Sequence, residues 1–308
     1  MTGKTTYPLV TIGILSYNRC DDLRNTLIHL LEDEYANSEI LLIDNASTDG
    51  TVAMLQQEFT SAKYPRLRIL RNESNLGIQA RNFLFDEAKG KYFFSFDDDS
   101  YPSTGSMITQ TVSIMESDPS IAVLCCSCIH PVTGYNETRG IERFATGGSP
   151  REGYDLVNIA AGGSAFRMED IRQTKGYDPD FFHGREENDL AFQLVHRDKR
   201  IVFCPQLIVS HLMSGSNRDV HSRLKYVVRN TLWLLWKYFP FPVSIPMALL
   251  FSIRRFLSCV KDVKRFGAVM RGLACGISGY RRMKMKAHRF SLTRSLKLWR
   301  SLWKMLYE

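Results

Sequence analysis

Short apolar runs alternate with amphipathic runs over the first hundred of the 308 residues. Four runs rich in β-branched and aromatic residues, over 9–15, 39–43, 67–70 and 91–96, predict buried strands. Apolar residues at helical spacing between these runs predict helices that end near positions 31, 59 and 88. Strands that alternate with helices in this way predict a doubly wound, mostly parallel α/β sheet.

The pattern becomes less regular beyond residue 119. Strands are predicted near Ile121, Ile159 and Ile201, and a polar loop over residues 131–153. A helix is predicted over 186–196, because four apolar residues between positions 190 and 195 fall on one face. We therefore expect one α/β domain over residues 1–225, followed by a helical tail over 226–308.

The tail combines apolar and basic positions. Its most apolar part, residues 227–253, contains three prolines and two basic residues, and the run 247–253 is too short to span a membrane. Farther on, apolar residues recur at helical spacing among lysines and arginines: Phe256, Val260, Val263, Phe266 and Met270, then Leu292, Leu296, Trp299, Leu302, Trp303 and Leu306. Basic amphipathic helices with tryptophan are typical of peripheral membrane proteins, although such helices also pack on a domain or form a homodimer.

The net charge of +8 is unevenly distributed. Residues 254–308 hold 15 basic and 2 acidic side chains, a net charge of +13, whereas the remaining residues carry −5. A basic block on a mildly acidic domain indicates a polyanionic partner, and an anionic membrane surface fits this. Nucleic acid is not expected, because no recognition motif accompanies the charge.

The cysteines and the first residues bear on the compartment. The seven cysteines lack the repeated two-residue spacing of a zinc site, and an odd number without a pattern is typical of reduced thiols in a cytosolic protein. Residues 1–8 are polar and do not predict a signal peptide.

Polar residues stand where three of the predicted strands end. Ser16, Asp44 and Asp97 each follow or close an apolar run. In doubly wound sheets ligands bind beyond the carboxyl ends of the strands, so we expect these three residues to share one cleft.

Asp97, Asp98 and Asp99 follow the apolar run 92–96 directly. Three adjacent carboxylates repel one another, and burial disfavours their ionisation. A divalent cation with oxygen ligands resolves this conflict, so the triplet predicts a Mn²⁺ or Mg²⁺ site in preference to a solvated loop or a helix cap.

A second acidic cluster, Glu186-Glu187-Asn188-Asp189, begins the helix predicted over 186–196. Acidic residues at a helix start stabilise the helix dipole, but a carboxylate held there beside a cleft can also act as a general base. His211 follows a predicted strand over 208–210 and is either a buried hydrogen-bonding histidine or a further metal ligand.

Several motifs, in order and spacing, resemble those of family 2 glycosyltransferases with the GT-A fold, in particular the rhamnosyltransferase-like bacterial type. They are VTIGILSYNR over 10–19, IDNASTDGT over 43–51, NLG over 75–77 with ARN over 80–82, DDD over 97–99, GGS over 162–164, EENDL over 186–190 and VSH over 209–211. The resemblance covers residues 8–240.

The resemblance implies an inverting transfer of a sugar from a UDP- or dTDP-sugar to a hydroxyl acceptor, in bacterial cell-surface glycan synthesis. It implies a nucleotide-binding half over residues 1–100 and an acceptor half over 101–225. Many relatives use lipid-linked acceptors, which agrees with a cytoplasmic protein held peripherally on the cytoplasmic face of the membrane.

The resemblance also implies roles for single residues. Asp44 would recognise the base, with Asn45, Arg81 and Asp98 also at the donor; Ser16 and Asn18 are either donor contacts or loop-capping residues. Asp97, Asp99 and His211 would bind the Mn²⁺ or Mg²⁺. The base would be Glu187, where the family usually has aspartate, with Asp189 as the alternative.

Three other functions compete with this one. A sugar-nucleotide pyrophosphorylase would need a glycine-rich loop after the first strand, and Ser16-Tyr17-Asn18-Arg19 has no glycine. A dinucleotide-dependent dehydrogenase would need a G-x-G-x-x-G turn there, which is missing. A non-catalytic sugar-nucleotide-binding scaffold stays open, because Glu187 departs from the usual motif.

Overall fold

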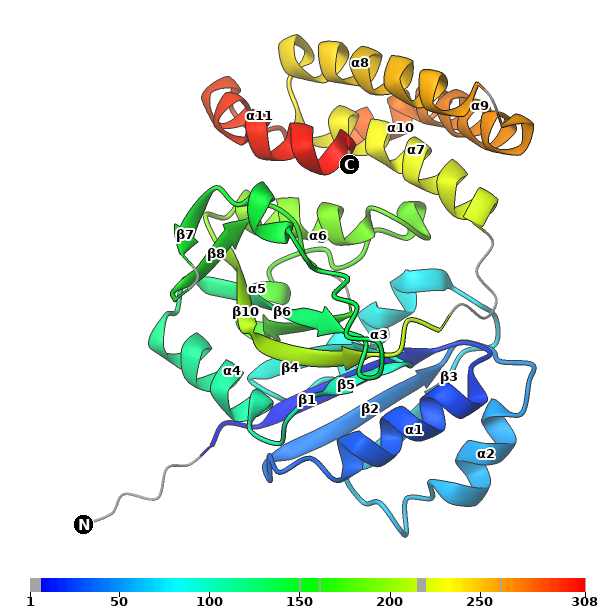
Figure 1. Ribbon diagram of the computed structural model, residues 1–308, viewed down its shortest axis with the longest axis vertical. Coiled ribbons are helices and arrows are strands. Elements are labelled where there is room, and N and C mark those ends of the chain that lie inside the picture. Colours follow the sequence, from blue (N-terminus) through cyan, green and yellow to red (C-terminus); the bar gives the residue numbers. More distant parts are fainter. Residues whose placement is uncertain (1–6, 150, 161, 215–219, 261, 308) are drawn as a thin grey trace.

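The computed structural model describes residues 7–149, 151–160, 162–214, 220–260 and 262–307. A ten-stranded mixed sheet forms the centre of the molecule, and a layer of helices from the C-terminal tail lies over one end of it (Figure 1). The strand order is β3-β2-β1-β4-β9-β6-β10-β8-β7, and β5 pairs with β10 outside this path.

The N-terminal half of the sheet is parallel, as the alternation of runs predicts. Its strands are β1 (Val10–Ser16), β2 (Ser38–Asp44), β3 (Leu67–Arg71) and β4 (Tyr92–Asp97). The connections contain α1 (Cys20–Leu31), α2 (Thr51–Glu58), η1 (Gly77–Ala80) and α3 (Arg81–Glu87). All four predicted strands in this half are confirmed.

The second half of the sheet mixes directions. β9 (Gly163–Arg167) lies antiparallel between β4 and β6 (Ile121–Ile129), and β10 (Arg200–His211) runs parallel to β6. The short strands β5 (Ser100–Pro102), β7 (Gly147–Ser149) and β8 (Gly153–Leu156) complete it. Its helices are α4 (Met107–Ser117), η2 (Ile141–Phe144), α5 (Met168–Ile171), η3 (Pro179–Phe181) and α6 (Glu186–Val195).

Two expectations for this half are wrong in detail. Ile159 lies between β8 and β9 and not in a strand; it is apolar because it is buried in the core. The predicted loop over 131–153 contains η2 and β7. β7 begins with two glycines, which carry no side chains to form a hydrophobic alternation, so pattern reading cannot detect it.

Side-chain alternation along the strands builds a core on each face of the sheet. Ile40 and Leu42 of β2 belong to the core on one face, whereas Leu41 and Ile43 belong to the core on the other. The second of these cores continues into the tail, where it includes Met247 and the other buried residues of its helices. The tail is therefore packed on the α/β domain through a shared hydrophobic core.

The tail consists of α7 (Val220–Tyr238), α8 (Phe241–Cys259), α9 (Val263–Ser278), α10 (Tyr280–Met285) and α11 (Leu292–Tyr307). The boundary expected between residues 225 and 226 falls inside α7. In Figure 1 helix α6 lies between the sheet and α7; α7 contacts α6, and α11 contacts η2 of the α/β domain.

The apolar positions at helical spacing between Phe256 and Met270 are divided between two helices. Helix α8 ends at Cys259, and α9 begins after Asp262, whose side chain accepts hydrogen bonds from the backbone N–H groups of Lys264 and Arg265. This N-cap starts a new helix within the periodic run. Within the described residues, α8 is the one helix long and apolar enough to cross a membrane, and 28% of its apolar window is buried.

Candidate active site

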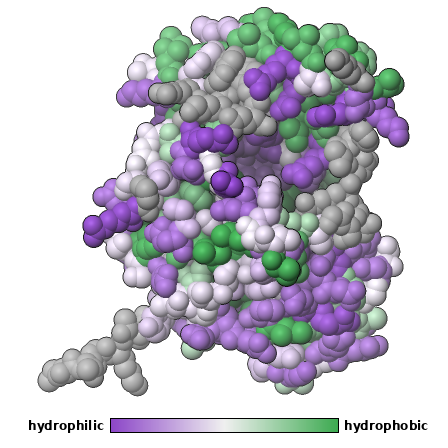
Figure 2. Space-filling view, in the orientation of Figure 1, coloured by the Kyte–Doolittle hydropathy of each residue, from purple (hydrophilic) through white to green (hydrophobic). Residues whose placement is uncertain are grey.

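The register of the strands brings the polar strand ends together. Ser16, the last residue of β1, lies opposite Asp44, the last residue of β2, and Leu15 lies opposite Asp97 at the end of β4. The expected adjacency of Ser16, Asp44 and Asp97 at one edge of the sheet is therefore confirmed. Figure 2 shows a hollow lined by hydrophilic residues between the sheet and the helical layer.

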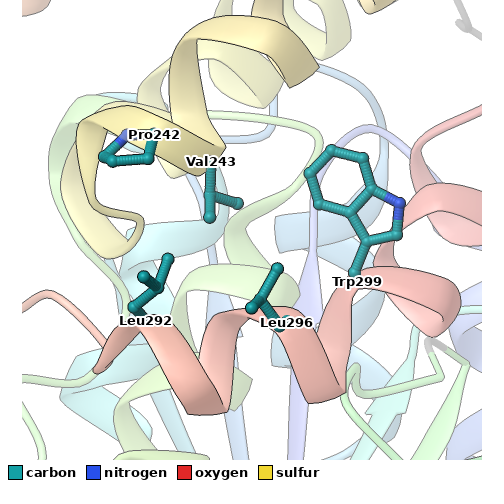
Figure 3. A pocket seen from close by; sticks show the side chains of 5 residues that line it. All are labelled: Pro242, Val243, Leu292, Leu296 and Trp299. Carbon is teal, nitrogen blue, oxygen red and sulfur yellow. The ribbon is translucent and has the colours of Figure 1, made fainter.

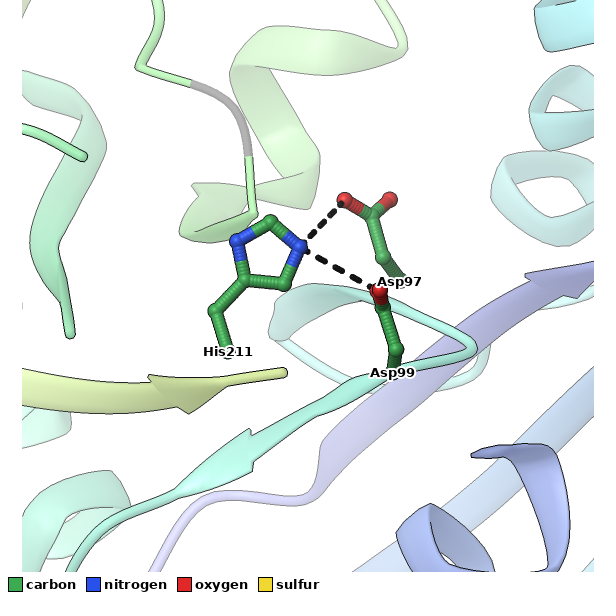
Figure 4. A group of neighbouring side chains, drawn as sticks. All are labelled: Asp97, Asp99 and His211. Carbon is green, nitrogen blue, oxygen red and sulfur yellow. Dashed lines mark hydrogen bonds and ion pairs between the residues drawn. The ribbon is translucent and has the colours of Figure 1, made fainter. Parts of the chain in front are cut away.

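Asp97, Asp99 and His211 form a compact cluster at this edge (Figure 4). The Nε2 atom of His211 lies 3.1 Å from Asp99 Oδ1 and 3.9 Å from Asp97 Oδ2, and the ligand atoms of all three residues lie within 4.8 Å of one another. His211 closes β10 and pairs with Ser100 of β5, so the β5–β10 pairing places the histidine beside Asp99. Carboxylate and imidazole groups at this spacing can hold one divalent cation.

Two arginines balance the charge of the aspartates. Arg19 Nη1 lies 2.8 Å from Asp99 Oδ2 and 3.2 Å from Asp98 Oδ1, and Arg81 Nη2 pairs with Asp97 Oδ1. Burial raises the pKa of Asp98 to about 7, against the lowering effect of Arg19. The Asp98 carboxylate also accepts a hydrogen bond of 3.3 Å from the backbone N–H of Tyr17, so it joins the loop after β1 to the end of β4.

His211 is held from both sides. Its Nδ1 lies 2.9 Å from Glu137 Oε2, opposite the contact with Asp99. Burial lowers the pKa of His211, but the hydrogen bonds to Asp99 and Glu137 outweigh this and raise it to about 10. Gly162, beside this histidine, has a φ of +93°, and an added Cβ would lie only 2.9 Å from Cys128 Sγ, so both the backbone conformation and the close approach of Cys128 favour glycine. A carboxylate behind a metal-binding histidine is a common orienting partner.

Asp44 is almost fully buried at the end of β2. Its carboxylate accepts hydrogen bonds of 3.3 Å from the backbone N–H of Ser47 and lies 3.5 Å from Nε of the exposed Arg71. Asp44 is thus fixed at the strand edge, next to the loop that follows β2.

Asn45 joins two loops. Its Oδ1 accepts hydrogen bonds from Asn72 Nδ2 at 2.9 Å and from the Leu76 N–H at 3.1 Å, and its Nδ2 donates to Asn75 Oδ1 and to the Gly77 carbonyl. The side chain therefore ties the end of β2 to the loop 72–77. In this structure Asn45 orders the loop through its hydrogen bonds to other residues of the protein.

Asn18 and Ser16 lie in and before the loop after β1. Asn18 has a φ of +54°, its Oδ1 accepts a 2.7 Å hydrogen bond from the Thr48 N–H, and its own N–H donates to Ser47 Oγ. These contacts are those of a loop-capping residue. Ser16 differs, because its hydroxyl is buried and has no hydrogen-bond partner among the described residues. The buried Arg81 Nε is likewise without one.

The cluster over 186–189 opens α6. Glu186 is 3% exposed and Glu187 is half-buried. Burial raises the pKa of both glutamates, and the nearby Arg81 opposes the shift at Glu187. Against the lowering effect of burial, the carboxylates of Asp97 and Glu187 both raise the pKa of Arg81. A half-buried carboxylate with a raised pKa suits a general base.

Asp189 is placed differently from Glu187. Its carboxylate is fully buried and lies 2.6 Å from Lys237 Nζ of α7, and it accepts hydrogen bonds from Tyr238 Oη and Gln193 Nε2. Both of its oxygens are occupied by neighbouring side chains, which attaches the tail to α6.

Sequence reasoning did not identify several residues of this site. Arg19 stands in the motif over residues 10–19, but the sequence indicates no site role for Arg19, Glu137 or Lys237. Glu137 lies in a loop 74 positions from His211, and Lys237 is 48 positions from Asp189. Such pairs have no sequence signal because they arise from tertiary packing.

Solved structures with the same fold include glycosyltransferases. The mannosyltransferase PcManGT from Pyrobaculum calidifontis, in complex with GDP-Man and Mn²⁺, has a TM-score of 0.60 at 18% identity and covers 98% of this chain and 88% of its own. TarS 1-349 of S. aureus in complex with UDP-GlcNAc has a TM-score of 0.59 at 14% identity, covering 90% of each chain. The chain has the GT-A fold.

Curated relatives match over the N-terminal part. TuaG of Bacillus subtilis, provisionally named as a teichuronic acid biosynthesis glycosyltransferase, is 30% identical over 130 residues, which are 42% of this chain and 47% of TuaG. WfaP of Escherichia coli is 32% identical over 111 residues, 36% of this chain and 42% of WfaP. Its name describes a UDP-Glc:alpha-D-GlcNAc-diphosphoundecaprenol beta-1,3-glucosyltransferase. The chain thus spans less than half the length of these relatives.

The family model described as glycosyl transferase family 2 matches residues 11–174, more than half of the chain. This range contains the strand ends, the aspartate triplet and the segment 162–164 around which the site is built. The chain belongs to glycosyl transferase family 2.

Proposed function

We propose that the protein is an inverting, metal-dependent glycosyltransferase that moves a sugar from a UDP- or dTDP-sugar to a hydroxyl acceptor in bacterial cell-surface glycan synthesis. The observation that carries the proposal is the cluster of Asp97, Asp99 and His211 at the edge where the strands end. It lies at the position where doubly wound sheets bind their ligands.

The donor atoms of the cluster fit Mn²⁺ or Mg²⁺. Two carboxylates and one imidazole converge within 4.8 Å, and carboxylates together with phosphate oxygens are the usual ligands of these ions in nucleotide sites. Asp97, Asp99 and His211 would hold the ion, which when bound stabilises negative charge on a leaving diphosphate. The proximity of Arg19 and Arg81 fits the same anionic group.

Side chains of the protein carry out the remaining steps. Glu187 takes the proton of the acceptor hydroxyl while that oxygen forms a bond to the anomeric carbon. The bond from this carbon to the diphosphate oxygen breaks on the opposite side, so the configuration inverts and the electron pair leaves with the diphosphate. Asp44 accepts a hydrogen bond from the ring N–H of uracil or thymine, which selects UDP or dTDP.

Ser16 and Arg81 support a donor site at this edge. Both carry a buried polar atom without a hydrogen-bond partner among the described residues, and such atoms cost free energy unless a ligand or water satisfies them. The paired Asp189 does not offer a free oxygen for proton transfer, and this favours Glu187 as the base.

The tail supports a peripheral position on the cytoplasmic face of a membrane. Ile245, Leu249, Ile253 and Leu257 follow one another at four-residue spacing on α8 and are 46–67% exposed. Figure 2 shows hydrophobic residues gathered over this helix. An exposed apolar face on a basic tail fits the interface of an anionic bilayer.

An apolar pocket of about 470 Å³ lies between α8 and α11 (Figure 3). It is lined by Pro242, Val243, Leu292, Leu296 and Trp299. This pocket has the character of a hydrocarbon site and would suit a chain of the bilayer or of a lipid-linked acceptor.

The competing proposal is a scaffold that binds the nucleotide sugar without reacting it. Release of nucleoside diphosphate from UDP-glucose, UDP-N-acetylglucosamine and dTDP-rhamnose, measured with Mn²⁺ and with EDTA, separates the two. Metal-dependent release that is lost in Glu187→Gln supports the enzyme. Metal-dependent binding of all three donors without release supports the scaffold.

A further inference from the structure

The turn that leads into Glu187 has a strained backbone. Phe182 and Arg185 are not glycines, yet their φ angles are +45° and +71°, and Gly184 between them has a φ of +79°. Such conformations are unfavourable for residues with a side chain and persist only where surrounding contacts impose them. Contacts from outside the turn must therefore hold it in this conformation.

Helix α7 of the tail supplies them through Asn230. This side chain is fully buried, and its Nδ2 donates hydrogen bonds to the carbonyl oxygens of Phe181 at 2.8 Å, His183 at 3.1 Å and Gly184. Three carbonyls of one turn thus converge on a single amide. An alanine at this position would leave these three carbonyl acceptors, of which that of Phe181 is buried, without that donor.

Lys237, two turns farther along α7, joins the two ends of the same segment. Its buried Nζ lies 3.0 Å from Asp178 Oδ2, before the turn, and 2.6 Å from Asp189 Oδ1, after it. Tyr238 Oη adds a 2.9 Å hydrogen bond to Asp189 Oδ1. The segment 178–189 is therefore fixed at both ends by Lys237 and in the middle by Asn230.

We propose that Asn230 and Lys237 are positioning residues that hold Glu187 in the geometry needed to take the acceptor proton. The proposal rests on the role proposed above for Glu187. It gives Asn230 and Lys237 of α7 a part in positioning the base, in addition to any role of the tail at a membrane.

The arrangement predicts that substitutions of Asn230 and Lys237 lower kcat and leave the donor KM nearly unchanged. No hydrogen bond or ion pair among the described residues joins Asn230 or Lys237 to Asp97, Asp99 or His211. The turn meets the donor side at a backbone contact, the 3.3 Å hydrogen bond from the Ile78 N–H to the Phe182 carbonyl, so changes at α7 should affect donor and metal binding much less than the chemical step. A misplaced base lowers the rate of the chemical step, and a displacement of about 1 Å can cost on the order of 10²-fold.

The test compares Asn230→Ala with Thr231→Ala in the full chain. Thr231 is equally buried on the same helix, but its side-chain hydroxyl donates a hydrogen bond to the Val227 carbonyl within α7. Asn230→Ala should increase deuterium exchange of the amides over 182–187, whereas Thr231→Ala should not. Exchange in this turn that is unchanged by Asn230→Ala would overturn the proposal.

Steady-state release of UDP from UDP-glucose or UDP-N-acetylglucosamine gives the second readout. Asn230→Ala should lower kcat by about 10²-fold with the donor KM within twofold, and Thr231→Ala should leave both constants near the wild-type values. Equal losses in the two variants would assign Asn230 a structural role only. Lys237→Met should behave like Asn230→Ala; if it does not fold, Asn230→Ala decides alone.

Glu187→Gln, measured alongside, keeps the two proposals distinct. If Glu187→Gln retains turnover, the proposed base is wrong, and the positioning role for that base falls with it. If Glu187→Gln loses turnover while Asn230→Ala keeps the wild-type kcat, the positioning proposal alone is wrong.

Discussion

The imidazole of His211 and the carboxylate of Asp99 lie 3.1 Å apart although 112 positions separate them in the chain. The contact follows from the antiparallel pairing of β10 with β5, the short strand that begins directly after Asp99. The pairing with β5 positions His211, and the end of β4 positions Asp99. The two side chains therefore point toward each other. The geometry of the candidate metal site is thus built into the sheet and not into a mobile loop.

Asp99→Asn should abolish metal-dependent turnover. The amide keeps the size of the carboxylate but removes the charge that a divalent cation needs, and a loss on the order of 10²–10³-fold is expected from comparable electrostatic groups. The measurement is nucleoside-diphosphate release with Mn²⁺, with circular dichroism as the test of folding. Asp86→Asn, on the exposed surface of α3, is the matched control and should retain full activity. Wild-type turnover in Asp99→Asn would rule out this metal site.

Glu187→Gln should lower kcat by roughly 10²–10⁴-fold without weakening the binding of UDP and Mn²⁺, because the change removes a proton acceptor and not a donor contact. Turnover measurements check the fall in kcat, and calorimetric titration with UDP checks that binding is not weakened. The exposed Glu169→Gln serves as the control. Weaker UDP binding with an unchanged kcat would place Glu187 in the donor site instead.

Asn45→Ala should destabilise the fold and loosen the loop 72–77. The side chain makes four hydrogen bonds across two loops and is 2% exposed, and unsatisfied buried partners cost about 1–3 kcal/mol each. We expect a loss of about 2–4 kcal/mol in the free energy of unfolding, measured by urea denaturation. Asn37→Ala, at an exposed site with one hydrogen bond to the Tyr7 carbonyl, should cost much less. Equal losses in both variants would contradict the account.

Acidification should weaken the attachment of the tail. Burial raises the pKa of Asp178, but Lys237 and Lys286 outweigh this and hold the pKa below its ordinary value. A lowered folded-state pKa gives stability that is present above the unfolded value of about 3.9 and is lost as the pH falls through the folded value. Asp178→Asn should therefore be less stable than the wild type at pH 7, with the difference shrinking below about pH 4.

Urea denaturation at pH 7, 5, 4 and 3 checks this dependence on Asp178. The exposed Asp86→Asn should track the wild type at every pH. A difference between Asp178→Asn and the wild type that stays constant with pH would mean that the ion pairs of Asp178 do not contribute to stability.

The exposed face of α8 should govern binding to anionic vesicles. Leu249 and Leu257 are 59% and 67% exposed, so Leu249→Glu and Leu257→Glu should leave the melting temperature within about 2 °C while reducing cosedimentation with phosphatidylglycerol vesicles severalfold. Val132→Glu, 84% exposed in a loop of the α/β domain, is the matched control. Vesicle binding that is unchanged in both α8 variants would show that this face does not meet the membrane.

Much of the fold of the N-terminal half can be predicted from the sequence, because short local runs of residues determine its strands. Buried parallel strands appear as short apolar runs, and ligand-binding residues such as Asp44 and Asp97 stand where those runs end. The motif resemblance then extended the prediction to His211. The strand near Ile159 was wrong because burial alone makes a loop residue apolar, and the glycines of β7 offered no pattern.

The counter-charges of the site could not be predicted in the same way. Three aspartates suggested a cation, but the sequence did not indicate that Arg19 and Arg81 also balance them. The ion pair between Lys237 and Asp189 joins the tail to the α/β domain, which the sequence predicts as separate parts of the chain. This ion pair depends on how α7 packs on α6. Contacts of this kind are decided by tertiary packing and leave no periodic signal.

The most direct test of the central claim is thermal stabilisation of the full chain by nucleoside diphosphates, each measured with Mn²⁺, Mg²⁺ or EDTA. A ligand at a hundred times its dissociation constant adds about 2.7 kcal/mol to the free energy of unfolding, which is visible as a rise in melting temperature. The account predicts a rise with UDP or dTDP that requires the metal and disappears in Asp99→Asn. A folded protein that no nucleoside diphosphate stabilises, with or without metal, would contradict it.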